Sequence, residues 1–221
     1  MKSSPTVIIA ATVSTLVLGA CHQGSRPGTS VVVATSNPWF AAASSGDAAS
    51  LNAAAASGAD VNAHELHDSN TPLHVAAFAG NVEAIRTLLA KGANVNATDE
   101  DDRTPLMIAC HRRQNAAAIA IIDAPANLDL RDREHQTALM FAAKNGELDV
   151  VQAMIQHKAN LDAQRTDGWT ALHFAAREGH TEIVRALKGA GASLTLRDRR
   201  GRTPFDIATG AKRPDVAALL K

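Results

Sequence analysis

A short motif that recurs at one constant spacing limits what this chain can fold into more than any other feature of its 221 residues. Segments of similar sequence begin at Thr71, Thr104, Thr137, Thr170 and Thr203, and the interval between successive copies never changes. In each segment the Thr is followed by Pro or Ala, and then by Leu or Phe. Five copies in one register predict a repeat architecture, in which each unit buries its apolar face only by stacking on its neighbours.

Each copy carries the local signals of two short helices. The Thr is a favourable N-cap, and a Pro at the first helical position loses nothing because its N–H would have no helical partner. A stripe of small residues follows, such as Ala76 and Ala77, and then Gly80, which suits a left-handed turn. A second apolar stripe comes next, as in Ile85 and Leu88. Glycines at the same place are Gly146 and Gly179, and the predicted turn residues before the Thr are Asp99, Asp132 and Asp198.

The composition favours thin helical layers. Aromatic residues make up 3% of the chain and Tyr is absent, yet the hydrophobic fraction is 46%, so Ala, Leu, Ile and Val must provide the packing. Small aliphatic side chains let helices approach closely. The 22 basic residues equal the 22 acidic ones. Because no basic excess attracts phosphate backbones, the sequence predicts no nucleic-acid partner.

The repeated segments resemble the ankyrin repeat. The resemblance rests on Thr-Pro-Leu-His at Thr71–His74 and on Gly-Ala-Asx-Val-Asn at Gly58–Asn62 and Gly92–Asn96, and it covers nearly everything from residue 37 to the end of the chain. It implies an all-α ankyrin-repeat solenoid of helix–turn–helix units joined by β-hairpin-like loops. It also implies that His74 and His173 bridge loop backbones. The expected units are 37–66, 67–98, 99–131, 132–164, 165–197 and 198–221, of which the first and last are caps.

The third unit departs from the family pattern. Arg113 stands where the helix-ending Gly is expected, and Pro125 replaces a Gly of the late turn. A left-handed Arg costs about 1 kcal/mol relative to Gly. Either His111, Arg112 and Arg113 form a functional basic patch, or Arg113 is drift in a unit that its neighbours hold in place, which we favour. Cys110 is predicted to be a buried small hydrophobe rather than a redox thiol.

The first residues predict export. Val7 to Leu18 is an uncharged apolar run that is too short to span a bilayer but matches the core of a secretory signal. The segment Leu18–Cys21 resembles the lipobox of bacterial lipoproteins, which implies a signal peptide over 1–20 and acylation of Cys21, with palmitate among the acyl chains. Residues 21–36 then form a flexible tether. With His22 in place of Asp, the resemblance implies the outer membrane, facing the periplasm. The alternative is an ordinary signal peptide with an incidental Cys.

In ankyrin proteins, loop tips and first helices line a concave groove that binds partners. Carried over position by position, this implies that the partner-binding residues are Asp68, Phe78, Glu100, Asp101, Arg103, His111, Arg112, Arg133, Lys144, Trp169, Arg177, Arg199, Arg200 and Arg202. The residues expected beside them are His67, Asn70, Glu134, Gln136, Asn145, Thr166, Asp167 and Glu178.

Two features of this surface have competing interpretations. Trp169 is predicted to project into the groove as an interface hot spot, and the alternative is packing against a neighbouring loop. Asp99 to Asp102 form an acidic tip, whereas Arg197, Arg199, Arg200 and Arg202 form a basic one. The predicted result is a dipolar groove that orients a partner; the alternative is an ordinary solvated surface.

No motif of an enzyme or a metal site is present in the sequence. His64 and His67 lie close together, but their spacing is not the helical spacing of a zinc protease, so a solvated loop is the better interpretation. There is no Gly-rich phosphate loop, nucleophile elbow or paired-Cys site. We therefore expect no cofactor and no catalysis, but a monomeric protein-binding adaptor or inhibitor in the bacterial envelope. A structural envelope spacer is the alternative, and an unrecognised enzyme is a third.

Overall fold

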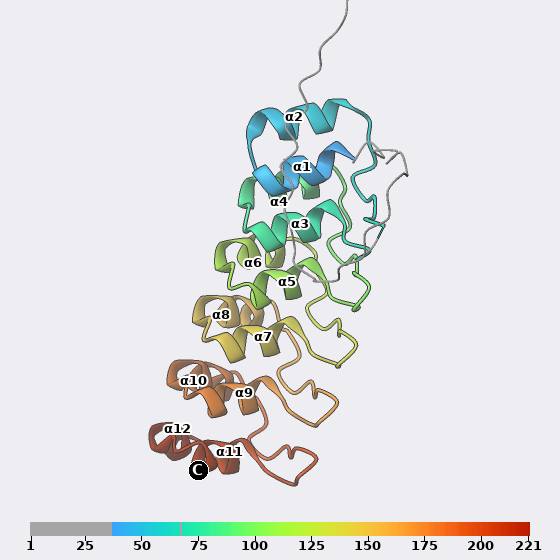
Figure 1. The fold of residues 1–221 in the computed structure, drawn as a ribbon. Helices are drawn as coiled ribbons and strands as arrows, with labels where there is room; N and C mark the ends of the chain where they lie inside the picture. Colours follow the sequence, from blue (N-terminus) through green and yellow to red (C-terminus); the bar gives the residue numbers. More distant parts are fainter. Residues whose placement is uncertain (1–36, 67) are drawn as a thin grey trace, which may run out of the picture. The chain divides into compact units, whose positions relative to one another are not determined.

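The computed structural model describes residues 37–66 and 68–221, which contain twelve α-helices and no strand. The helices form six consecutive pairs, so the described part of the chain is the all-helical repeat solenoid that the sequence predicts (Figure 1). The predicted signal peptide, the lipidation site Cys21, the tether and His67 lie outside the described residues. In the part that is described, no helix has both the length and the apolar character needed to cross a bilayer.

The pairs stack in two layers. Each first helix contacts the first helix of the next unit, and each second helix contacts the next second helix. With six to nine residues each, these helices are too short to be stable in isolation and depend on their neighbours. The first helices are α1 (Pro38–Ser45), α3 (Pro72–Ala79), α5 (Pro105–His111), α7 (Ala138–Asn145), α9 (Ala171–Glu178) and α11 (Pro204–Gly210). The second helices are α2 (Ala48–Ala56), α4 (Val82–Ala90), α6 (Asn115–Ile122), α8 (Leu148–Gln156), α10 (Thr181–Gly189) and α12 (Pro214–Leu219).

Two histidines connect neighbouring units, as predicted. The backbone N–H of Thr71 donates to Nδ1 of His74 (3.1 Å), so Nε2 carries the proton and donates to the carbonyl of Arg103 in the next unit (2.9 Å). His173 makes the same bond to the carbonyl of Arg202 (3.2 Å). Burial lowers the pKa of both imidazoles, because a charged ring would be desolvated there. The structural role of these histidines is confirmed.

The connecting loops are hairpin-like turns organised by an aspartate. In the third unit, Oδ1 of Asp99 accepts hydrogen bonds from the backbone N–H groups of Asp101 and Arg103, both at 2.9 Å. The N–H of Asp99 also donates to the carbonyl of Arg103 (2.9 Å), which closes the turn. Asp132 and Asp198 accept the corresponding backbone bonds in their own loops. Their predicted role as turn residues is confirmed.

A second contact between units explains the glycine after the first helix. At four of the joints the N-cap residue of a second helix, Asn81, Gln114, His180 or Arg213, reaches back over the end of the preceding unit's first helix. Asn81 lies over Gly46 and donates to the carbonyl of Ala43 (2.9 Å), and His180 lies over Gly146. A Cβ on Gly46 would lie 2.8 Å from the side chain of Asn81. The glycine is therefore needed for space as well as for its left-handed backbone.

The core is one continuous cluster of small and branched side chains along the stack. Cys110 lies within it, fully buried, and burial raises the pKa of its thiol well above the usual range. The thiol is therefore protonated and inert, as the sequence predicts. Arg113 does adopt the left-handed conformation, with φ of 60°.

Candidate protein-binding surface

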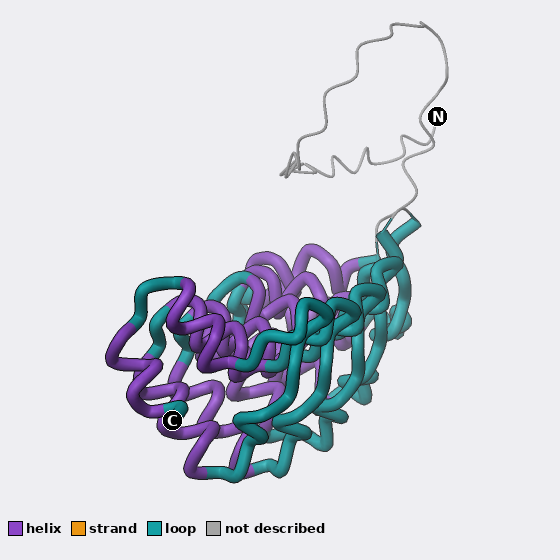
Figure 2. Tube along the Cα trace, turned by 90° about the horizontal axis from the view of Figure 1, so that it is seen from below, coloured by secondary structure: helices purple, strands orange, loops and turns teal. Residues whose placement is uncertain are grey.

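The loop tips lie in a row beside the helices (Figure 2). Hydrogen bonds between backbone groups link each tip to the next. For example, the N–H of Arg133 donates to the carbonyl of Asp101 (3.1 Å), and that of Arg199 donates to the carbonyl of Asp167 (2.9 Å). We call the tips at 99–103, 132–136, 165–169 and 198–202, together with the ends of the first helices beside them, the loop face. Because its backbone is connected from unit to unit, side chains on this face are held in a fixed order.

The first pocket of the loop face lies between the third and fourth units and has a volume of about 290 Å³. Its charges are largely paired within the protein, because Arg103 contacts Asp99 (3.0 Å) and Asp101 (2.9 Å), and Arg133 contacts Asp101 (3.4 Å). The predicted acidic tip is therefore partly neutralised by arginines of its own and of the next loop. The pocket is lined by Asp101, Arg103, His111, Asp132, Arg133, Glu134, Gln136 and Phe141.

His111 is the titratable group on the helical wall of this first pocket. Its ring lies 5.5 Å from that of Phe141, centroid to centroid. Burial, and then the positive charges of Arg103 and Lys144, lower the pKa of His111. The imidazole is therefore neutral at pH 7, and it adds no charge to the predicted basic patch of the third unit.

The second pocket lies between the fifth and sixth units and has a volume of about 390 Å³. Trp169 forms part of its wall, but only 8% of this residue is exposed. The prediction that Trp169 is exposed in the groove is wrong, and the indole packs against side chains of α9 in its own unit rather than against the neighbouring loop of the alternative. The ring of Phe174 lies 5.0 Å from the indole, and the guanidinium of Arg177 lies 5.1 Å from its centroid. The pocket is lined by Arg165, Asp167, Trp169, Arg177, Asp198, Arg199, Arg200 and Arg202.

Both aspartates of the second pocket are already engaged. Asp167 pairs with Arg165 at 2.5 Å, and this hydrogen bond lowers the pKa of Asp167. Asp198 pairs with Arg202 at 2.7 Å. Although burial would raise the pKa of Asp198, its hydrogen bonds to Arg202 and to backbone groups lower it to about 2. Among the described residues, Arg199 and Arg200 form no ion pair, and both are exposed.

Comparison with known proteins agrees with this architecture. A family model described as ankyrin repeats in three copies matches residues 39–132, 116–198 and 139–221. This chain belongs to the ankyrin-repeat family. Ankyrin repeats are generic protein–protein interaction modules and are generally non-catalytic. A search of the curated proteins found no match to this ankyrin chain.

The remaining predicted contact residues lie on the earlier ankyrin units. Phe78 is half-buried beneath Arg112, whose guanidinium lies 4.1 Å from the ring centroid. Lys144 is exposed near the end of α7, and Asp68 and Glu100 are exposed at adjacent tips. The N–H of Glu100 donates to the carbonyl of Asp68 (3.1 Å). Among the predicted contact residues that the structure describes, arginines without an ion pair are brought together only in the pocket between the fifth and sixth units.

One residue with unusual electrostatics was not predicted. Glu147 is the N-cap residue of α8 and is only 4% exposed. Its Oε1 accepts a hydrogen bond from Asn145 (3.2 Å), while its Oε2 has no partner. Burial raises the pKa of Glu147 to about 7, against the opposing effects of Asn145 and Arg113. A sequence signal existed, because the corresponding positions of the other units hold Asn81, Gln114, His180 and Arg213, and the one other acidic residue at this position, Asp47 in the first unit, is exposed.

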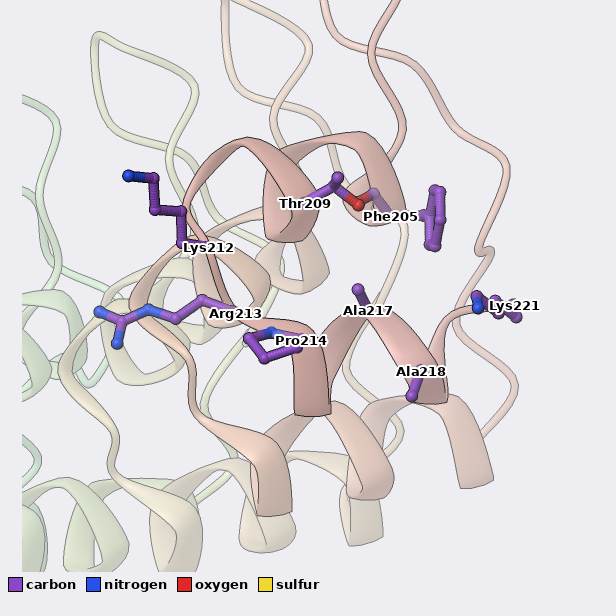
Figure 3. Close-up of a pocket in the computed structure, with 8 residues that line it drawn as sticks. All are labelled: Phe205, Thr209, Lys212, Arg213, Pro214, Ala217, Ala218 and Lys221. Carbon is purple, nitrogen blue, oxygen red and sulfur yellow. The ribbon is translucent and has the colours of Figure 1, made fainter.

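A third pocket, of about 340 Å³, lies on the outer face of the sixth unit. Figure 3 shows that Phe205 from α11 and Ala217 and Ala218 from α12 lie on this face. Phe205 is only partly buried, whereas Leu172 at the same position of the fifth unit is 1% exposed. The difference arises because no described unit covers the outer face of the last ankyrin repeat.

In the histidine-rich first loop, one histidine makes a hydrogen bond within the loop. His64 bonds through Nδ1 with the carbonyl of Ser69 (2.8 Å), which helps to close the loop. Across residues 37–66 and 68–221, His, Cys, Asp and Glu side chains form no group of three that could hold a metal ion. His67 lies outside the described residues, so its predicted place beside the groove stays a prediction.

Proposed function

We propose that this ankyrin protein is a non-catalytic binding module that acts as an adaptor or inhibitor of another protein through its loop face. The observation that carries the proposal is the pocket between the fifth and sixth units, where Arg199 and Arg200 are unpaired among the described residues. A surface with a rigid backbone and arginines that lack an ion-pair partner is suited to bind a protein of complementary charge. The family supports the same conclusion, because ankyrin repeats bind proteins.

The proposed location is the periplasmic side of the outer membrane, where the chain is held by acyl groups on Cys21. The support is the apolar run Val7 to Leu18 and the lipobox-like segment that ends at Cys21. Cys21→Ser should leave the protein soluble and unlabelled by a palmitate analogue, whereas the wild type should be labelled and sediment with membranes. A wild-type protein that is soluble and unlabelled would contradict the anchor.

Co-purification from native envelopes tests the binding function. The wild type should capture a partner saturably, and Arg199→Glu with Arg200→Glu should lose most of it. A matched control reverses two exposed arginines in the second helix layer, Arg86 in α4 and Arg185 in α10. This control should keep the partner. If the wild type captures nothing saturably, the protein is instead a structural spacer.

Two roles fit an adaptor or inhibitor in the envelope. One is neutralisation of a toxic secreted enzyme, as an immunity protein would perform it, and the other is support of a resident stress-response enzyme. The neighbouring genes discriminate between them. A toxin or secretion gene beside this one favours the first role, and a catalase-like gene favours the second.

A further inference from the structure

We propose that the pocket between the fifth and sixth units binds a carboxylate-rich segment of the protein partner, with Arg199 and Arg200 as the recognising residues. This inference rests on the proposed binding function and adds the chemistry of the partner. Three observations support it: the charge balance of the pocket, the fixed position of its backbone, and the sign of the charges farther along the loop face.

The charge balance leaves two guanidinium groups without a carboxylate. Five arginines and two aspartates line the pocket. Asp167 is occupied by Arg165, and Asp198 by Arg202. Oδ1 of Asp198 also accepts the backbone N–H groups of Arg200 and Arg202, both at 2.9 Å. Every carboxylate oxygen of these two aspartates already accepts at least one hydrogen bond within the protein. A guanidinium binds a carboxylate through two parallel hydrogen bonds, so a Glu or Asp side chain is the fitting ligand.

The backbone that carries these two arginines is fixed in advance. The N–H of Arg199 donates to the carbonyl of Asp167 in the neighbouring loop (2.9 Å). A Cβ on Gly168 would lie 2.9 Å from the Cα of Asp198, so the two loops are in close contact. Only the exposed Arg199 and Arg200 side chains must be ordered when a partner binds. A rigid backbone lowers the entropic cost of that step.

The indole of Trp169 supplies an apolar wall beside the charges. It lies under the guanidinium of Arg177, which is itself paired with Glu178 (2.6 Å). An ion pair beside an apolar wall is less screened by water than one on an open surface. Trp169 is also a built-in fluorescent reporter, since Trp39, the second tryptophan, lies in α1 and is 2% exposed.

The signs of the charges along the loop face favour a protein segment over a nucleic acid. The tip of the third unit carries four successive acidic residues, Asp99 to Asp102. Arg103 and Arg133 pair with three of them, but Glu100 is exposed and forms no ion pair among the described residues. A polyphosphate backbone that followed the loop face from the basic pocket would meet these carboxylates and be repelled. A protein segment can change its sign along its length, with acidic residues at the sixth unit and neutral or basic ones at the third.

Titration of the full chain with hexaglutamate, acetylated and amidated at its ends, tests the inference. At low salt we expect saturable binding, a change in Trp169 emission, and weakening as salt is added. Arg199→Glu with Arg200→Glu should lower the affinity by about tenfold or more, the range of a charged hydrogen-bonded pair. Arg86→Glu with Arg185→Glu makes the same change in net charge on the second helix layer. It should leave the affinity within about twofold, because neither residue lines the pocket and added salt screens their more distant charges. Circular dichroism checks that each variant is folded.

Three outcomes would overturn the inference. Hexaglutamate that does not saturate, or an equal loss of affinity in both double variants, would show that the pocket is not a carboxylate site. Tighter binding of a ten-nucleotide oligothymidylate through the same two arginines would assign the pocket to nucleic acid. If the peptide fails but the wild type still captures an envelope protein saturably, the inference fails while the proposed function stands.

Discussion

Arg113 and Glu147 interact electrostatically at the joint between the third and fourth units, and the positive charge of Arg113 opposes the rise in the pKa of Glu147. At the other joints a glycine lies beneath the side chain that caps the next second helix, as Gly80 lies beneath Gln114 and Gly179 beneath Arg213. At this joint a left-handed Arg stands in place of the glycine, and a buried carboxyl stands in place of a neutral or basic side chain. The two departures from the pattern therefore compensate each other in charge.

Glu147→Gln should stabilise the protein at pH 8 and have little effect at pH 5. The pKa of Glu147 is raised from 4.5 to about 7, so the folded state holds a proton that the unfolded state has released. Protonated Glu147 therefore makes its full contribution to folding stability below about pH 4.5, and this contribution is lost as the pH rises through 7. Between pH 5 and pH 8 the wild type should lose about 2 to 3 kcal/mol relative to the variant. Urea unfolding at both pH values measures this, with the exposed Glu83→Gln as control. An equal difference at the two pH values would contradict the prediction.

Arg113→Gly should change the free energy of unfolding through two opposing effects, which a double-mutant cycle can separate. Glycine relieves the left-handed backbone by about 1 kcal/mol, but it also removes the cation that offsets the buried charge of Glu147. At pH 8 we expect a smaller gain in the wild type than in the Glu147→Gln background, where no charge needs balancing. Free energies of unfolding for the four proteins give the coupling. Equal gains in both backgrounds would show that the two residues are independent.

Gly80→Ala should destabilise the stack more than Gly92→Ala. Both glycines are left-handed, with φ of 74° and 88°, so both variants lose about 1 kcal/mol of backbone preference. A Cβ at residue 80 would also lie 2.7 Å from Cδ of Gln114, whereas nothing lies within 4 Å of a Cβ at residue 92. The extra cost should be up to about 1 kcal/mol, because the amide end of Gln114 can partly move aside. Thermal unfolding measures it, and Gln114→Ala should remove the extra cost from the Gly80→Ala variant. Equal losses without this rescue would exclude the steric contact.

The sequence predicts what is local to a cap or a turn and misses what depends on side chains outside that segment. The caps at Thr71 and Thr104, the left-handed Gly80 and the Asp turns follow from a few neighbouring residues. They recur at a constant spacing along the chain, so the solenoid could be predicted. The burial of Trp169 depends on Arg177 and Phe174 beyond its own loop, and the pairing of Asp101 depends on Arg133. The repeated pattern does not show which side chains pack on Trp169 or which arginine of the next loop pairs with Asp101.

Gly168→Ala should weaken binding of the carboxylate probe while leaving the ankyrin fold intact. The new Cβ would meet backbone atoms where the sixth unit begins, 2.9 Å from the Cα of Asp198 and 3.1 Å from the carbonyl of Arg197 just before it, and these cannot swing aside as a side chain can. The loops of the fifth and sixth units must separate, which moves Arg199 and Arg200 away from Trp169. Gly201→Ala is the matched control, because Gly201 is also left-handed, with φ of 76°, and nothing lies within 4 Å of its Cβ. Both variants should lose about 1 kcal/mol from the left-handed backbone, but only Gly168→Ala should lose hexaglutamate affinity and shift the Trp169 emission. If both variants bind the peptide as the wild type does, close contact of the two loops is not what positions the arginines.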